Sequence, residues 1–165
     1  MKVSTKTKDI VIVGIMSALL ITVQVSLSFL PNIELVSLLV ILSTIIFGWK
    51  TLYIIYVFVL AEGFLYGFGI WWICYLYVWT ILMLISMIFR KNRSPFFWAV
   101  IAGAFGLAFG ALCLLPYFFI GGVAMAISDY INGIPFDVIH CISNYVSTLV
   151  LFKPLYNLFV RISKK

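Results

Sequence analysis

The chain has 165 residues, of which 65% are apolar and only 10% are charged, and its mean hydropathy is +1.21. A folded surface in water needs more polar groups than this, so a water-soluble domain is excluded and lipid is the expected solvent. The net charge is +6, but the basic residues are confined to short breaks between apolar runs, which argues against a nucleic-acid-binding protein.

Six apolar runs follow one another, and each is predicted to be a membrane-spanning helix. A bilayer core of about 30 Å needs about 20 apolar residues in helical form. The first run is long and no small-x-small cleavage site follows it, so we expect a retained helix and not a signal peptide. The last run is expected to end near Pro154. The sequence predicts an all-α membrane protein in which residues 1–165 form one domain of six transmembrane helices, at about 9–30, 33–48, 51–69, 71–89, 96–119 and 134–152.

The basic residues all fall on one side of these runs. With the N-terminus in the cytoplasm, the 11 Lys and Arg residues lie in or beside the inside segments. None lies in the outside segments, which are residues 31–34, 67–71 and 120–135. Because loops rich in Lys and Arg stay in the cytoplasm, this asymmetry predicts cytoplasmic termini, an even number of spans and a multi-pass protein of the cell membrane.

Polar residues begin the last apolar run. Asp137, His140 and Asn144 are spaced i, i+3 and i+7, so they share one helical face. Polar groups inside a bilayer are costly and face either a cavity or a neighbouring helix. Since the outer half of the predicted bundle holds several other polar groups, we favour a ligand cavity over a polar contact between helices.

Aromatic residues crowd the start of the fourth run. Trp72, Tyr75 and Trp79 also share a helical face. The alternatives are an aromatic belt at the membrane surface and a set of rings that stack on a flat or cationic ligand. Together with the polar groups, they make up the predicted substrate-binding residues: Asn32, Glu34, Glu62, Trp72, Tyr75, Trp79, Asp137, His140 and Asn144.

The charges in this set indicate the chemistry of the ligand. Acids without a Lys or Arg on the outer side argue against a strongly anionic molecule such as a phosphate ester. A neutral or cationic heteroaromatic molecule fits better, and a large corrinoid is the remaining alternative.

The stretch FLPNIELVSLLVI, residues 29–41, contains an acid at the start of an apolar run. Pro31 and Asn32 predict a tight turn, with Asn32 as the cap of the following helix. Glu34 has two interpretations. In one it stabilises the start of the helix through the helix dipole. In the other it belongs to a loop that closes the cavity and contacts the ligand.

Small residues recur at intervals of four in two runs. Gly14 and Ala18 form such a pair in the first run, where either internal packing or a partner helix is possible. Ala102, Gly106 and Gly110 continue the pattern in the fifth run, where we favour internal packing. Small residues at this spacing let two helix backbones approach closely.

Motifs for catalysis or cofactor binding are missing from the sequence. It has no P-loop, HExxH or GxSxG motif, so we expect no enzyme, no cofactor and no ATPase of its own. The three cysteines lie far apart in apolar runs, and neither a zinc site nor a disulfide framework is expected. Two alternatives remain: a stand-alone permease or channel, and a membrane enzyme that uses His140 with Asp137 or Glu62.

Taken together, these features resemble the substrate-binding S components of energy-coupling factor (ECF) vitamin transporters. Residues 29–48 are similar to the first-loop and second-helix segment of that family, and Gly14 with Ala18 matches its small-residue contact face on the first helix. The resemblance implies a six-helix bundle in the bacterial plasma membrane that binds a vitamin or precursor from the outer side, below a gating first loop. It also implies docking through the first helix onto a transmembrane coupling subunit, which carries two cytoplasmic ATPases.

Overall fold

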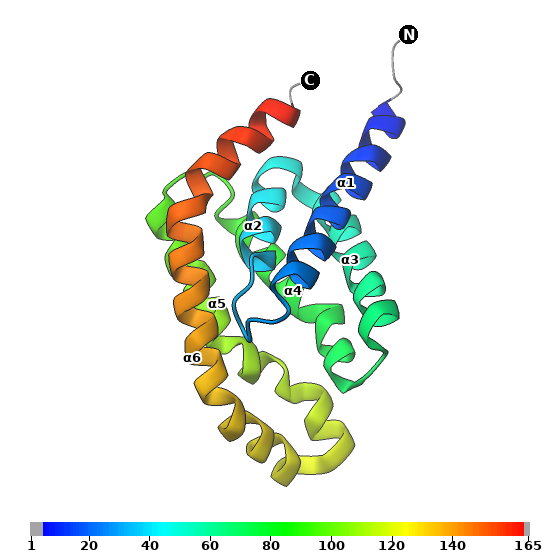
Figure 1. Ribbon diagram of the computed structural model, residues 1–165, viewed down its shortest axis with the longest axis vertical. Coiled ribbons are helices and arrows are strands. Elements are labelled where there is room, and N and C mark those ends of the chain that lie inside the picture. The colour runs from blue at the N-terminus through cyan, green and yellow to red at the C-terminus, as the bar shows by residue number, and fades with distance from the viewer. Residues whose placement is uncertain (1–4, 164–165) are drawn as a thin grey trace.

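The computed structural model describes residues 5–163, which form a bundle of helices (Figure 1). Lys2, Lys164 and Lys165, which contribute to the predicted charge asymmetry, lie outside the described residues. The elements are α1 (Thr5–Leu27), α2 (Val36–Phe47), the short 3-10 helix η1 (Gly48–Lys50), α3 (Thr51–Tyr66), α4 (Ile70–Ile88), α5 (Pro95–Leu112) and α6 (Leu114–Ser163).

Five helical segments among the described residues are long and apolar enough to cross a membrane. One of them, Val36–Tyr66, contains both α2 and α3, which η1 joins. The 12 residues of α2 extend only about 18 Å at 1.5 Å per residue, which is less than the thickness of a bilayer core. The predicted all-helical chain with membrane-length apolar helices is therefore confirmed, whereas the count of six spans and the orientation stay predictions.

The C-terminal third differs from the prediction. Residues 120–135 are helical and do not form an open loop: α6 (Leu114–Ser163) consists of two helices that meet at a kink at Gly122, whose φ of 72° favours glycine. The predicted end near Pro154 is also wrong. Phe152 and Phe159 are buried on either side of this proline, so both parts of the helix stay packed on the bundle and the helix continues.

Helix α2 lies at the centre of the bundle. Every residue from Val36 to Ile45 is buried, and α2 contacts α1, α3, α4, α5 and α6. A helix that is apolar on all sides is expected in such a place, because no face needs water. The outer helices instead expose many large apolar side chains, as expected of surfaces that meet lipid.

Two sets of small residues have different surroundings. A Cβ atom at Gly106 would lie 2.8 Å from the carbonyl oxygen of His140, so this glycine permits the close packing of α5 on α6. The predicted internal role of the small residues in the fifth run is thus confirmed. Gly14 and Ala18, by contrast, are exposed, and a Cβ atom at Gly14 would meet no atom within 4 Å.

The start of α1 and the end of α6 lie at the same end of the molecule (Figure 1). Lys50 Nζ and Asp9 Oδ1 are 2.5 Å apart and tie η1 to α1 near this end. Arg93 donates to the Tyr156 hydroxyl at 2.8 Å and lies over its ring, which ties the loop between α4 and α5 to α6. Basic residues of two separate connections thus each bind a different helix of the bundle.

Candidate functional site

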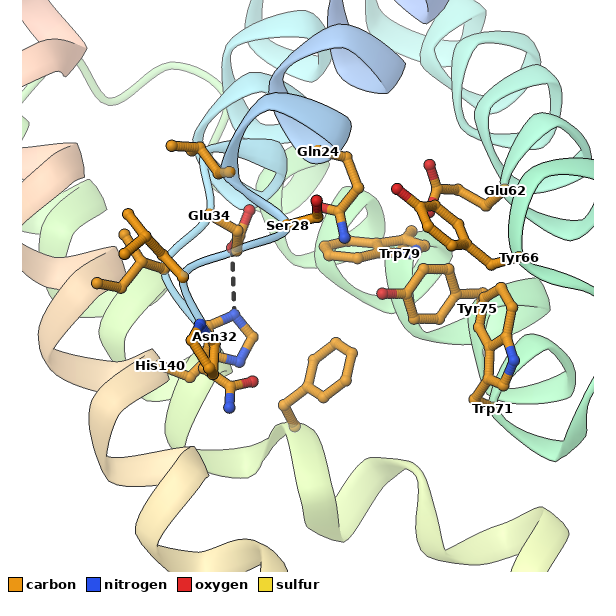
Figure 2. Close-up of a pocket in the computed structure, with 15 residues that line it drawn as sticks. Gln24, Ser28, Asn32, Glu34, Glu62, Tyr66, Trp71, Tyr75, Trp79 and His140 are labelled. Carbon is orange, nitrogen blue, oxygen red and sulfur yellow. Dashed lines mark hydrogen bonds and ion pairs between the residues drawn. The ribbon is translucent and has the colours of Figure 1, made fainter.

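A cavity of about 290 Å³ lies where α1 ends, under the loop of residues 28–35. The ends of α1 and α3, the start of α4 and single side chains of α5 and α6 complete its wall. Figure 2 shows two sides, with Asn32, Glu34 and His140 on one and Glu62, Tyr66, Trp71, Tyr75 and Trp79 on the other. The full lining is Gln24, Leu27, Ser28, Leu30, Pro31, Asn32, Ile33, Glu34, Glu62, Tyr66, Trp71, Tyr75, Trp79, Phe109 and His140.

The loop over the cavity turns sharply at Asn32. Its φ is 58°, a left-handed conformation that asparagine tolerates better than most residues. The predicted capping role of Asn32 is wrong, because it stands too far from the helix start. Glu34 takes that role, since its Oε2 accepts a hydrogen bond of 2.9 Å from the backbone N–H of Ser37 in the first turn of α2.

The second oxygen of Glu34 faces α6. Its Oε1 lies 3.2 Å from Nε2 of His140, and only 12% and 5% of the two side chains are exposed. The ring of Phe109 packs edge-on against the imidazole, with 5.0 Å between ring centres. Burial by itself raises the pKa of the Glu34 carboxyl, but its bonds to His140 and Ser37 and the charge of His140 outweigh burial and hold it below the usual 4.5.

Aromatic rings form the opposite wall. Tyr75 stands edge-on to both Trp71 and Trp79, with ring centres 5.1 and 5.4 Å apart. Phe109 approaches Trp79 at 5.8 Å and joins this wall to His140. Edge-to-face contacts of this kind restrain each ring, so the wall is largely formed before a ligand enters.

Glu62 is the most buried acid of the cavity. Only 2% of the residue is exposed, and its Oε1 is a buried atom without a hydrogen-bond partner. Buried indole Nε1 of Trp79 and Nδ1 of His140 also have none. Buried polar atoms in folded proteins are nearly always bonded, so it is unusual that three residues lining one cavity each have an unpartnered buried polar atom. Among residues 5–163, no three His, Cys, Asp or Glu side chains group closely enough to hold a metal ion.

Three predicted site residues do not line the cavity. Trp72 turns toward α3 and donates to the carbonyl of Val59 at 2.8 Å. Asp137 accepts from the backbone N–H of Gly110 at 3.1 Å, and Asn144 donates to the Ser37 hydroxyl at 3.1 Å.

Asp137, His140 and Asn144 do share a buried face, as predicted. Neighbouring helices occupy both ends of that face, and only His140 reaches the cavity. In the structure, Asp137 and Asn144 make contacts between helices, which is the alternative interpretation of these residues.

Several lining residues were not predicted. Tyr66 and Trp71 flank the turn between α3 and α4, and Phe109 reaches the cavity from α5. Gln24 could have been predicted from the sequence, because it is the one glutamine of the chain and lies inside an apolar run. Helical spacing predicted the aromatic face of α4. It could not predict which of these side chains line the cavity, because that depends on the position of α3.

A disulfide joins two walls of the cavity. Cys74 of α4 and Cys113, just after α5, are bonded, with their Cα atoms 5.2 Å apart. The expectation that the cysteines form no disulfide was therefore wrong for this pair, because the fold brings together two residues that are 39 positions apart in the sequence. Cys74 directly precedes Tyr75 of the aromatic wall, and the bond ties α4 to the end of α5. Cys141 is free.

No known protein family, curated protein or solved structure matches the chain.

Proposed function

We propose that the protein is the membrane-embedded, ligand-binding S component of an ECF-type importer for a vitamin or vitamin precursor. The observation that carries this proposal is the cavity of about 290 Å³, which combines restrained aromatic rings with polar atoms that lack partners. A cavity of this size, with few polar groups, suits one small organic molecule. Loading from the outer side, and release that depends on partner ATPases, follow from the family resemblance.

Two independent features support an outward-facing cavity. The basic residues gather near the end where α1 begins and α6 ends, which favours that end for the cytoplasm. The disulfide lies at the cavity end, and disulfides persist in oxidising compartments outside the cytoplasm. In the proposed topology of six spans, α2 is a short central span that the other helices shield from lipid on all sides.

The packing beside the cavity favours a binding subunit over a stand-alone channel. Phe58, Val78 and Leu82 are fully buried in the core next to the aromatic wall. A channel needs a continuous polar path, and the packed core of apolar side chains around α2 provides little of one. We therefore propose that release of the ligand requires a partner.

The first helix provides a surface for that partner. Gly14 and Ala18 are exposed on α1, and the space over Gly14 is open. A small-residue face of this kind allows a second helix to approach closely. We assign it to the transmembrane coupling subunit, which would carry the two cytoplasmic ATPases.

Calorimetry on the purified protein in lipid nanodiscs tests the binding function. Titration with a panel of B vitamins and their precursors should identify one ligand that binds at a ratio of one to one. Trp71→Ala should weaken this binding by about tenfold or more, because the indole is part of the cavity wall. Trp49→Ala is the matched control, since Trp49 is 60% exposed on η1 and does not line the cavity. If no member of the panel binds, or if both variants behave alike, the proposal fails.

A further inference from the structure

Glu62 differs from the other acid that lines the cavity. Both oxygens of Glu34 have partners within the protein, namely His140 and the backbone N–H of Ser37. Glu62 is 98% buried, since only 2% of it is exposed, and its Oε1 has no partner. In Figure 2 its carboxyl group extends from α3 toward the aromatic side of the cavity. An acid in this position is costly unless a donor or a positive charge compensates it.

The protein itself does not supply that compensation. None of the described residues that line the cavity is Lys or Arg, and the one histidine, His140, is already bonded to Glu34. A bound ligand that presents hydrogen-bond donors or a positive charge would supply this compensation. Because an ionised carboxylate only accepts hydrogen bonds, the ligand must present N–H or O–H donors to it.

The rings on this side of the cavity favour a charged and flat donor. Tyr66, Trp71, Tyr75 and Trp79 line the same side as Glu62. Aromatic faces attract cations, and flat groups stack between rings that already stand at fixed angles. A carboxylate bordered by aromatic rings is thus complementary to a planar cation that carries two parallel N–H donors.

We infer that the cavity recognises a planar aromatic cation whose amidinium-like N–H pair binds the Glu62 carboxylate, with its ring among the aromatic side chains of α3 and α4. This inference rests on the proposed function, because it names the class of ligand that the binding subunit takes. It assigns Glu34 and His140 to holding the loop and the polar side of the cavity. It assigns Glu62 to selecting the charge of the ligand.

Benzamidine and benzamide are suitable probes, because they have nearly the same shape but only benzamidine is cationic at neutral pH. Titration of each into the full-length protein in nanodiscs, followed by ligand-observed NMR, gives the two affinities. The wild type should bind benzamidine at least about tenfold more tightly than benzamide. Glu62→Gln, which keeps the shape but removes the charge, should abolish this preference. Asp129→Asn removes the same charge from an exposed position away from the cavity and should leave the preference intact.

Three results would overturn the inference: equal affinities in the wild type, no binding of benzamidine, or a preference that persists in Glu62→Gln. Should that variant fail to fold, Glu62→Asp withdraws the carboxylate while keeping its charge. It should reduce the preference several-fold, and an unchanged preference would again overturn the inference. Benzamidine is not a vitamin, so the outcome is independent of the vitamin panel and of the role in an importer.

Discussion

At the scale of single residues, Glu34 has two structural functions at once. One oxygen caps α2 through the N–H of Ser37, and the other contacts His140 on the same side of the cavity. Both interpretations of this acid therefore agree with its place in the fold, since it stabilises a helix start and also lines the cavity under the loop. Its contact with a ligand stays a prediction.

Replacing Glu34 by glutamine should lower the free energy of unfolding by about 1–2 kcal/mol at neutral pH, because a single amide oxygen cannot retain both charged contacts. The pKa of Glu34 is lowered in the fold, so its stabilising effect is present above its usual pKa of 4.5 and is lost as the pH falls below that value. Thermal unfolding of both proteins between neutral and acidic pH measures this. The difference between them should shrink on acidification, and a difference independent of pH would contradict the assignment.

At the scale of elements, the seam between α5 and α6 depends on glycine. A methyl group at Gly106 would lie 2.8 Å from backbone atoms of His140, whereas the space over Gly14 is empty. The close approach of α6 to α5 also positions His140 at the cavity. The packing of two helices and the position of a site residue are therefore coupled.

Gly106→Ala should destabilise the protein by about 1–3 kcal/mol, because overpacking outweighs the higher helix propensity of alanine. Gly14→Ala adds the same methyl group to α1 in open space, so its stability should be equal to the wild type or up to about 1 kcal/mol higher. Melting temperatures in one detergent allow the comparison. Equal stability of the two variants would show that the α5–α6 seam is looser than described.

The disulfide between Cys74 and Cys113 holds α4 against the end of α5. Alkylation of the unfolded protein without reductant should modify Cys141 alone, as mass spectrometry would detect, and reductant should expose both partners. Reduction should also lower the free energy of unfolding by about 2–4 kcal/mol. Cys141→Ser serves as the control and should not change the effect of reductant. Three reactive cysteines in protein prepared without reductant would contradict the bond.

At the scale of the whole molecule, the orientation in the membrane is open to direct measurement. The proposed orientation places Asp129 outside and Lys91 in the cytoplasm. In a Cys141→Ala background, Asp129→Cys should react with a membrane-impermeant maleimide on intact cells. Lys91→Cys should react only after the membrane is opened. The reverse pattern would turn the cavity toward the cytoplasm and contradict loading from outside.

Much of the fold was predictable from local features of the sequence. Runs of apolar residues predicted helices, and Gly106 with its neighbours predicted close internal packing. The continuation of α6 through Pro154 was not predictable, because the buried contacts of Phe152 and Phe159 on both sides of the proline decide it. A local rule for proline does not include such contacts.

The candidate site was predictable only in part, because it too depends on contacts between helices. Six of the nine predicted residues line the cavity: Asn32, Glu34, Glu62, Tyr75, Trp79 and His140. Helical spacing identifies a shared face but not the neighbour that the face meets. Trp72 consequently bonds to α3 and Asn144 to α2. The pairing of Cys74 with Cys113 was not predictable either, because it also depends on which helices are neighbours in the fold.

We propose that the protein binds its ligand alone but transports it only with an ATPase module. Uptake of the calorimetrically identified vitamin into proteoliposomes tests this most directly. The protein alone should give no uptake, whereas the complex with its coupling subunit and ATPases should give uptake that requires ATP. Gly14→Leu should retain ligand binding and lose uptake, because the leucine side chain fills the open face of α1. Uptake by the protein alone, without ATP, would show that it is not a binding subunit that depends on an ATPase module.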